Sequence, residues 1–589
     1  MSKTRAVWLF IGGLTLIRLS MLGSTDLEFD EAHYWMWSER LAPGYFSKGP
    51  GIAFAIRAST AIFGATEFGV RFWSPILAAG TSLLLFYFGR RLFGENVGFW
   101  TAIAFNVIPI FNVGAFVMTT DALSIFFWMA ATFTFWLAVE KSPQFSFYWP
   151  LTGLLIGLGF LSRWINAFEI VCVLLVLAFA PRLRQEFKRP GLYWLLGAFV
   201  VCTIPPIVWN AQHAWITLIH LRTRGSLSED VGFRPLEAFK FLGEHFLFYS
   251  PLLFAALVWG VIGSWRRVNK QFKILFLFWF GLPVFAFYFL LSMNHVPTPN
   301  WDAVSFLSLG LLAVHYWCER VETRGVKIFA TAAILLGFIV SLFALDSDLL
   351  RSAGFRFRRS DPSDRLRGWK SMTAEVDRIR NDLETKLGEK LFLIADERHR
   401  ASEISFYLRD KRVEGPGHPP VYIVESQDLI NQFSFCRATI SLSNSRQSRV
   451  NRRMKPSPSK KEKTSLWDAA RCLFVITRRI RRTTSVPRLN LPNLWAQSSC
   501  GVLANTCATG RFFFAAIIAR CRYERGNRIA RCFCGGSRLQ RRREYVDLAT
   551  GIASRARGFG LRNRFCRRRL DRSQRRENRT RAERASSSI

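Results

Sequence analysis

The segment from residue 436 to the end of this 589-residue chain lacks histidine, because all eight histidines lie earlier. It holds eight of the 11 cysteines, but no two of them stand as Cys-x-x-Cys. A Cys/His zinc site needs both residue types, so this segment is not expected to bind zinc in that way. The first 345 residues lack something else, since their apolar residues follow no amphipathic period and collect in long blocks.

Those blocks predict a membrane protein that crosses the bilayer many times. Half of the residues are hydrophobic, and the chain contains 55 Phe and 20 Trp. A spanning helix needs roughly 20 apolar residues. The expected fold class is an all-α polytopic membrane domain over residues 1–345, with about eleven transmembrane helices, followed by a small α/β domain on the outer face. The eleven candidate spans are about 6–22, 69–89, 97–113, 121–139, 148–162, 164–181, 191–209, 246–264, 273–291, 302–318 and 327–345.

Charge distinguishes two kinds of link between these spans. The links predicted to lie outside are long and of mixed charge, at 23–68, 210–245 and 292–301. Cytoplasmic links carry an excess of Lys and Arg, so we expect a cytoplasmic N-terminus and a domain on the outer side of the membrane after residue 345. No small-x-small cleavage site follows the first span, which predicts an uncleaved anchor. The links predicted to lie inside are short and basic, with Arg90, Arg91, Lys141, Arg182, Arg184, Lys188, Arg189, Arg266, Arg267, Lys270, Lys273, Arg320, Arg324 and Lys327.

Residues 346–435 have the pattern of a small α/β domain. A helix is expected in "WKSMTAEVDRIRNDLETKL", where apolar residues recur at three- and four-residue steps. The strand-like "KLFLIA" follows, and then a second helix in "ASEISFYLRD". The turn "EGPGHPP" leads into a further strand, "VYIV".

The composition changes abruptly at Cys436. Residues 1–435 carry a net charge of +8, whereas residues 436–589 carry +30, with 34 Arg and four Lys. Three interpretations stay open for this tail: a basic nucleic-acid-binding segment, a disordered segment that binds lipid headgroups, or an out-of-frame translation of the gene. The outer-face topology disfavours nucleic acid as a partner. A break in the middle of a domain favours the out-of-frame interpretation.

The first outer link contains "FDEAHYWMWSERLAPGYFSKGP", which begins with adjacent carboxylates and ends with a lysine. Asp30 and Glu31 precede a stretch with the apolar period of a short interfacial helix, and Lys48 lies in a compact Gly/Pro loop. Asp121 begins the fourth span on the same face. Each feature also has an ordinary explanation, which is a solvated acidic loop for the pair and a helix cap for Asp121.

Carboxylates and a cation at the membrane surface suit the transfer of a sugar from a lipid phosphate to a hydroxyl or amine. An alcohol is a poor nucleophile until its proton leaves, so a base must lie near the acceptor. A positioned Lys or Arg can stabilise the departing phosphate without a metal. A transporter or flippase would instead show internal repeats and ionisable residues at mid-membrane. A non-catalytic scaffold of a surface-polymer complex would leave these groups without a role.

Residues 1–435 resemble the GT-C glycosyltransferases of family 39, the superfamily of protein O-mannosyltransferases and aminoarabinose lipid A transferases. The resemblance implies an inverting transferase that uses a polyprenyl-phosphate-linked sugar donor and no cofactor, among the lipids of a bacterial inner membrane. The acceptor stays open between lipid A, another glycolipid, a surface polymer and a protein. The stretches that carry the resemblance are "DEAHYWMW", "GYFSKGP", "FGVRFWSPILA", "TTDAL", "GLGFLSRWINAF", "WNAQHAW", "PNWDAVSFL" and, in the outer domain, "ADERHRASEISFYL".

The resemblance also implies roles for single residues. Asp30 would be the catalytic base, with Glu31 beside it orienting the acceptor or shaping the loop. Lys48 would contact the donor phosphate, and Asp121 would be a second carboxylate of the site. Many relatives have Pro-Pro directly after this lysine, whereas this chain has Gly-Pro-Gly, and the neighbour Ser47 replaces a carboxylate linked to zinc in some relatives. We therefore predict no metal.

Five further residues are weaker members of the predicted site. Arg163 and Arg71 would be additional contacts to the donor phosphate, although an interfacial arginine also explains Arg163. Asn210, His213 and His295 are candidates for the acceptor entrance, or anchors at the membrane interface.

Overall fold

The structure is a computed structural model in which the chain divides into two units, residues 1–480 with 512–520 and residues 481–511 with 521–589. All the described residues belong to the first unit. They are residues 2–224, 233–294, 297–346, 348–352, 365–388, 391–411, 421–423, 471–478 and 513–519.

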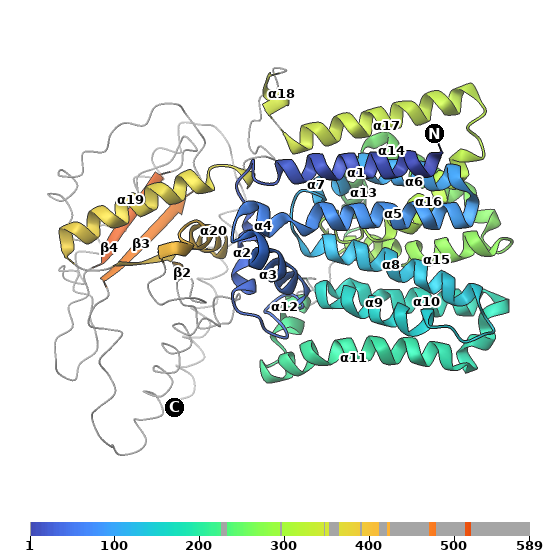
Figure 1. Ribbon diagram of the computed structural model, residues 1–589, viewed down its shortest axis with the longest axis horizontal. Coiled ribbons are helices and arrows are strands. Elements are labelled where there is room, and N and C mark those ends of the chain that lie inside the picture. Colours follow the sequence, from blue (N-terminus) through green and yellow to red (C-terminus); the bar gives the residue numbers. More distant parts are fainter. Residues whose placement is uncertain are drawn as a thin grey trace, which may run out of the picture. The chain divides into compact units, whose positions relative to one another are not determined.

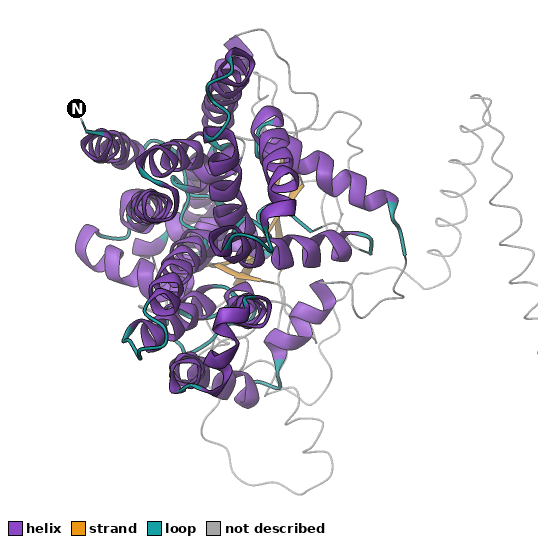
Figure 2. Cartoon of the chain, turned by 90° about the vertical axis from the view of Figure 1, so that its right-hand side faces the viewer, coloured by secondary structure: helices purple, strands orange, loops and turns teal. Residues whose placement is uncertain are grey.

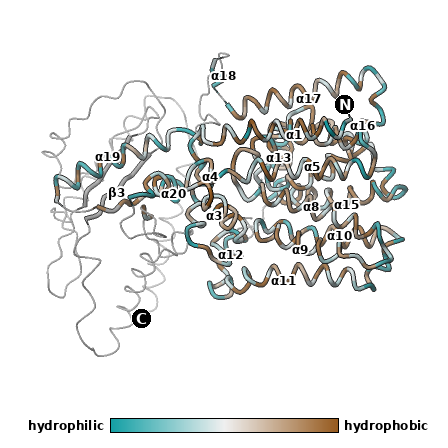
Figure 3. Tube along the Cα trace, viewed as in Figure 1, coloured by the Kyte–Doolittle hydropathy of each residue, from teal (hydrophilic) through white to brown (hydrophobic). Residues whose placement is uncertain are grey.

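Long apolar helices run side by side in the first unit (Figure 1), and Figure 2 shows them nearly end-on. Hydrophobic residues continue along their length in Figure 3. Within the described residues, six helices are long and apolar enough to cross a membrane, or up to eight if each of two bent pairs is one span. The six are α1 (Lys3–Met21), α4 with α5 (Glu67–Arg71 and Trp73–Phe93), α8 (Thr120–Glu140), α11 (Pro190–Gln212), α15 (Phe272–Ser292) and α17 (Arg324–Leu345).

Proline begins the second member of each bent pair. It has no N–H to donate and it disfavours the helical conformation of the residue before it. The first pair turns by 118° and the second by 117°. The pairs are η1 and α10 (Trp164–Ala167, Phe168–Phe179) with η2 (Pro181–Lys188), and α13 (Leu236–Phe248) with α14 and η3 (Pro251–Ser264, Trp265–Arg267). The other helices of this region are α2 (Phe29–Ser38), α3 (Gly51–Phe63), α6 (Glu95–Val107), α7 (Pro109–Gly114), α9 (Tyr148–Ser162), α12 (Ile216–Arg224), α16 (Ser305–Cys318) and α18 (Asp348–Ser352).

The all-α polytopic fold is confirmed. About eleven spans were expected, whereas six to eight helical segments of the described residues have the length and composition of a full span. Each of the eleven predicted segments is helical, although 148–162 and 302–318 hold helices of only 15 and 14 residues. The segment 97–113 is broken into α6 and α7 at Pro109. Ile108 adopts an extended conformation there (φ −71°, ψ 121°), as expected for a residue that precedes proline.

Close helix contacts in the bundle depend on small residues and on aromatic packing. A Cβ atom on Gly153 of α9 would lie 1.9 Å from the carbonyl oxygen of Leu195 on α11, so only glycine permits this approach. Phe135 of α8 stacks on Phe276 of α15, with ring centroids 5.7 Å apart. Such offset pairs bury large apolar surfaces with a defined geometry.

A small α/β layer follows the bundle in the sequence, and its helices and first two strands match the prediction closely. The sheet has the order β2-β1-β3-β4, in which β1 is parallel to β2 and β3, and β3 is antiparallel to β4. Both β3 and β4 come from the segment after residue 436, where no strand was expected. The elements are α19 (Trp369–Leu387), β1 (Leu391–Ala395), α20 (Arg398–Tyr407), η5 (Arg409–Lys411), β2 (Val421–Ile423), β3 (Arg471–Arg478) and β4 (Phe513–Ala519).

Helix α20 packs directly on α2, the helix that opens the first outer link. The ring of Phe406 meets the edge of Trp35, with centroids 5.0 Å apart, and both side chains are buried. Nδ1 of His33 lies 3.0 Å from the hydroxyl of Ser402. His33 is buried and is therefore a packed residue of this interface.

A buried acid lies in this interface. Glu403 of α20 is fully buried, and neither of its carboxylate oxygens has a hydrogen-bond partner among the described residues. Burial raises the pKa of Glu403 well above its usual range, and the nearby negative charges of Glu28, Glu31 and Asp26 raise it further. The folded protein therefore favours the neutral carboxylic acid at this position.

We predict that Glu403 makes the stability of the protein decrease as the pH rises. A carboxyl with a raised folded pKa binds its proton more tightly when folded, so its favourable contribution is complete below the unfolded pKa of about 4.3 and declines above it. Glu403→Gln mimics the neutral acid and should flatten the fall in melting temperature between about pH 5 and pH 8. Thermal unfolding of the detergent-solubilised chain measures this. Asp382→Asn, a change at an exposed acid on α19, should keep the slope of the parent; equal slopes in all three proteins would contradict the prediction.

Candidate active site

The site is organised at the N-terminus of α2. Glu28 is the N-cap residue, and its carboxylate accepts the backbone N–H of Asp30 at 2.8 Å. The carboxylate of Glu31 accepts a hydrogen bond from the backbone N–H of Glu28 at 2.8 Å, which completes a capping box. This local sequence therefore starts the helix at Phe29 and fixes both predicted carboxylates in its first turn.

Three acids are crowded into that turn. Burial raises the pKa of Glu28 to about 8, and the negative charges of Asp30 and Glu31 add to the effect. Because Glu28 gains its proton easily, one negative charge of the group can be neutralised near neutral pH.

Glu31 is engaged in a buried ion pair with Arg71. Its side chain is fully buried, and the two oxygens accept Nε of Arg71 at 3.0 Å each and Nη2 at 2.7 Å. The backbone N–H of Met118 donates to Oε1 of Glu31 at 2.8 Å. A carboxylate with these charge-assisted bonds is held rigidly and is poorly placed to accept a proton from a substrate.

The guanidinium of Arg71 also donates hydrogen bonds to backbone oxygens of the loop that follows α1. Nη1 donates to the carbonyls of Leu22 at 2.9 Å and Thr25 at 3.1 Å, and Nη2 donates to the carbonyl of Asp26 at 2.6 Å. Arg71 is 2% exposed. Arg71 therefore holds the loop after α1 in place, and its contact to a donor phosphate stays a prediction.

Asp121 and Arg163 form a second ion pair, at the start of α8 and just after α9. The Asp121 side chain is 20% exposed, whereas Arg163 is buried. Asn300 joins them, because its Nδ2 donates to Oδ2 of Asp121 at 2.7 Å and its carbonyl accepts Nη1 of Arg163 at 3.1 Å. Asp121, Arg163 and Asn300 therefore form one connected group, and the roles predicted for Asp121 and Arg163 stay predictions.

The loop of Lys48 packs against the segment that carries Arg163. A Cβ atom on Gly49 would lie 2.2 Å from the carbonyl oxygen of Leu161, and the indole N–H of Trp164 donates to the carbonyl of Ser47 at 3.2 Å. The Gly-Pro-Gly sequence thus permits a contact that a bulkier residue would prevent. Lys48, which is half-buried, is held beside residues 161–164.

Asp30 differs from its neighbour Glu31 in its surroundings. Oδ1 of Asp30 lies 3.3 Å from Nη1 of Arg398, and 34% of each side chain is exposed. Arg398 begins α20, so the α/β layer contributes a charged group beside Asp30. This contact links residues 368 positions apart, and sequence reasoning did not include Arg398.

Asn210 lies in the last turn of α11, and His213 is the C-cap residue of that helix. Asn210 is buried, and its side chain joins the Pro206 carbonyl (2.9 Å) to the backbone N–H of Thr217 (3.2 Å). His213 stacks on Trp209, with centroids 4.1 Å apart. These contacts favour the anchor over the acceptor entrance for both residues. His295 lies outside the described residues.

A buried histidine–aspartate pair supports the Asn300 loop, and no local sequence pattern predicted it. Nε2 of His245 lies 3.1 and 3.0 Å from the two oxygens of Asp302, and neither side chain is exposed. Asp302 stands in the "PNWDAVSFL" stretch, but its partner lies 57 positions away. The pair fixes the chain two residues after Asn300 and so helps to position Asp121.

No group of three or more His, Cys, Asp or Glu in the described part of the chain is arranged to hold a metal ion. The expected absence of a metal stays a prediction. The site as described consists of an accessible carboxylate, a lysine loop, an Asp–Arg pair and a buried Glu–Arg support. These groups can accept a proton and can stabilise an anionic leaving group.

Comparison with known proteins gives three matches of interest. Residues 47–209, which include the lysine loop and the Asp121–Arg163 pair, match the family model described as dolichyl-phosphate-mannose-protein mannosyltransferase. The lipid A galacturonosyltransferase RgtD of Rhizobium johnstonii is 27% identical over 431 residues, covering 72% of this chain and 86% of that protein. The undecaprenyl phosphate-alpha-4-amino-4-deoxy-L-arabinose arabinosyl transferase of Serratia proteamaculans is 24% identical over 54% of this chain. The match spans only 58% of the Serratia protein's length.

A solved structure has a similar fold. ArnT from Cupriavidus metallidurans, bound to undecaprenyl phosphate, superposes with a TM-score of 0.57 at 15% identity, covering 88% of this chain and 98% of that one. That protein has the same polytopic architecture. The likeness concerns the fold, and the side-chain geometry described above comes from this chain alone.

We predict that Arg71→Ala destabilises the protein far more than Arg57→Ala. Removal of one partner leaves the buried carboxylate of Glu31 uncompensated, which costs about 3–5 kcal/mol. Arg57 pairs with Glu39 at 3.3 Å with 53% of its side chain exposed, and such a surface pair contributes at most about 1 kcal/mol. Thermal unfolding of both variants in the same detergent checks this. Similar melting temperatures for the two variants would show that the Glu31–Arg71 pair does not support the fold.

Proposed function

We propose that this chain, a family 39-like membrane glycosyltransferase of the GT-C fold with a polyprenyl-phosphate sugar donor, uses Asp30 as the general base that activates a hydroxyl group of its acceptor. The observation that carries the proposal is the contrast between two adjacent carboxylates. Glu31 is buried and held by Arg71, whereas a third of the Asp30 side chain stays exposed.

Asp30 is the best candidate among the carboxylates of the site. Asp121 is paired with Arg163 and also accepts a hydrogen bond from Asn300, so its charge is already used. The ion pair of Asp30 with Arg398 at 3.3 Å joins two partly exposed side chains, and a surface pair of this kind is weak. An acceptor can therefore displace Arg398 at little cost and bring its hydroxyl to Oδ1 or Oδ2 of Asp30.

The proposed reaction is a single displacement. The acceptor hydroxyl oxygen attacks the anomeric carbon of the sugar while its proton passes to Asp30. The bond between that carbon and the phosphate oxygen breaks, and the polyprenyl phosphate departs with the electron pair. Attack from the face opposite the leaving group inverts the configuration at the anomeric carbon.

Lys48 is proposed to stabilise the departing phosphate. An ammonium placed where negative charge develops lowers the barrier most effectively in a site that excludes water. The close packing of its loop on residues 161–164 supports a fixed position. Arg163 is proposed as the second phosphate contact, with Asp121 and Asn300 holding its guanidinium in place.

The donor side of the site is proposed to open at the periplasmic surface of the inner membrane. The basic links at 90–91, 182–189 and 266–273 favour the cytoplasm for the opposite end of the bundle. The acceptor is proposed to be a hydroxyl-bearing glycolipid, with lipid A as the first to test, because the relative from Rhizobium johnstonii carries lipid A in its name.

Replacement of Asp30 by Asn should slow sugar transfer by roughly 10²–10⁴-fold, the usual contribution of a general base. Binding of the donor should change little, because the base contacts the acceptor. The measurement is transfer from a pool of polyprenyl-phosphate-linked sugars in membranes, at matched protein levels, with donor binding measured in parallel.

Two further variants make this test specific. Glu67→Gln removes an acid of the same outer link that begins α4 and should transfer sugar like the parent. Lys48→Gln should weaken both transfer and donor binding, unlike Asp30→Asn. If the parent is active and Asp30→Asn transfers sugar at the same rate, Asp30 is not the base.

A further inference from the structure

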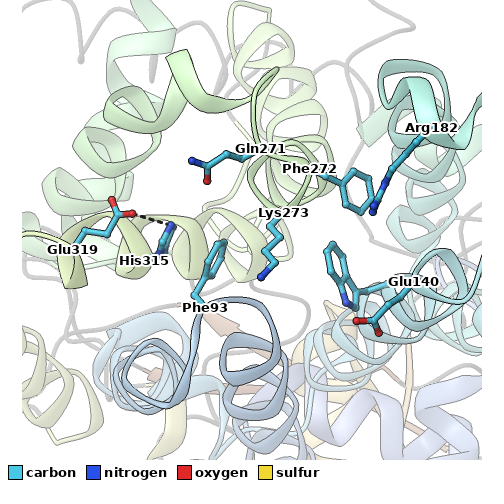
Figure 4. Close-up of a pocket in the computed structure, with 9 residues that line it drawn as sticks. Phe93, Glu140, Arg182, Gln271, Phe272, Lys273, His315 and Glu319 are labelled. Atoms are coloured by element: carbon cyan, nitrogen blue, oxygen red, sulfur yellow. Dashed lines mark ion pairs between the residues drawn. The ribbon is translucent and has the colours of Figure 1, made fainter.

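We propose a second lipid-phosphate site in a pocket at the opposite end of the bundle from Asp30. The pocket has a volume of about 550 Å³, within the range of small-molecule sites. Its wall includes Phe93, Glu140, Arg182, Phe272, Lys273 and Glu319 (Figure 4). None of these residues belongs to the proposed active site, and the proposal does not rest on the proposed function.

The position of the pocket follows from two long helices. α5 begins just after Arg71 and ends at Phe93, and α8 carries Asp121 in its first turn and ends at Glu140. Each helix has 21 residues, which at 1.5 Å per residue is about 30 Å. The pocket is therefore separated from the active site by about the thickness of the hydrocarbon core.

Two cations lie against aromatic walls in this pocket. The guanidinium of Arg182 sits 3.6 Å from the ring centroid of Phe272, and Nζ of Lys273 donates to the carbonyl of Leu92 at 2.6 Å. An ammonium has three N–H donors, and Leu92 takes one of them. Figure 4 shows Lys273 pointing toward the middle of the group of side chains, between Phe93 and Phe272.

The acids of the pocket are neutralised by cations from outside it. Glu140 pairs with Arg91 at 2.7 Å. Glu319 pairs with Arg267 at 2.6 Å and also lies 3.4 Å from His315. Arg182 and Lys273 therefore leave the pocket with a net positive charge, which suits an anionic ligand.

The shape of the chain at the rim favours a lipid over a free anion. Arg182 lies on η2, which turns by 118° from the apolar helix before it and is exposed at its start. A segment that leaves the bundle in this way lies along the membrane surface. Basic pockets between helices at such a surface bind lipid headgroups. Phe272 and the buried Trp136 provide an apolar wall for the first carbons of the lipid's hydrocarbon chain.

The test uses native mass spectrometry of the full chain. The protein is mixed with defined lipids in detergent, the detergent is removed in the instrument, and the number of lipids that stay bound is compared between variants. The probes are phosphatidylglycerol, zwitterionic phosphatidylcholine, polyprenyl phosphate and inorganic phosphate. The parent should retain one more lipid phosphate than the double variant Arg182→Gln/Lys273→Gln, whose apparent affinity at this site should fall at least about tenfold. The control Arg266→Gln/Lys270→Gln removes the same charge from the same end, from residues that do not line the pocket, and should retain lipid like the parent.

Each outcome decides the proposal. Loss of phosphatidylglycerol in the double variant assigns the site to bulk lipid, and loss of polyprenyl phosphate alone assigns it to the carrier; both support it. Equal retention by parent and double variant, equal loss in the control, or inorganic phosphate that binds as tightly as the lipids would overturn it. Arg182→Lys/Lys273→Arg keeps both charges and should retain binding, which separates lost charge from lost folding.

Discussion

The buried ion pair between Glu31 and Arg71 connects the segments that form the candidate site. Arg71 holds the loop after α1 through three carbonyl oxygens, and Glu31 holds the start of α2 and the backbone at Met118. Asp121 follows Met118 by three positions. One interaction therefore fixes Asp30, which adjoins Glu31, relative to the helix that carries the second carboxylate. Because both charges are buried, the arrangement is stable only while every partner is present.

Two adjacent acids can have different roles because a helix turns by about 100° between neighbouring residues. Glu31 faces the bundle and meets Arg71, whereas Asp30 faces the outer edge, where α20 supplies Arg398. The outer domain is thus in contact with the site. Helix α20 also carries the buried Glu403, whose pKa is raised mainly by burial.

The helices were predictable, because the length of a hydrophobic block is a local property of the chain. The roles assigned to the site residues stay predictions. The helix at Trp369–Leu387 was predicted with the bounds observed. Where prediction failed, a local break or a distant partner was responsible. Pro109 divided one segment, and His245 meets Asp302 across 57 positions. The strands β3 and β4 come from a segment whose composition carries no strand period, and the origin of that segment stays a prediction.

The sequence by itself determined the membrane class, the order of the helices and the residue types available in the links between them. Those properties depend on how neighbouring residues divide between water and lipid. Only the tertiary structure decided which charges pair. Arg71, which was predicted to contact a phosphate, donates its hydrogen bonds to Glu31 and to backbone carbonyls. Arg163 pairs with Asp121 and donates to the carbonyl of Asn300. Ion pairing acts over a few ångströms, so it depends on which helices pack together. The sequence alone therefore does not predict a pair such as Arg71 and Glu31, which lie 40 positions apart.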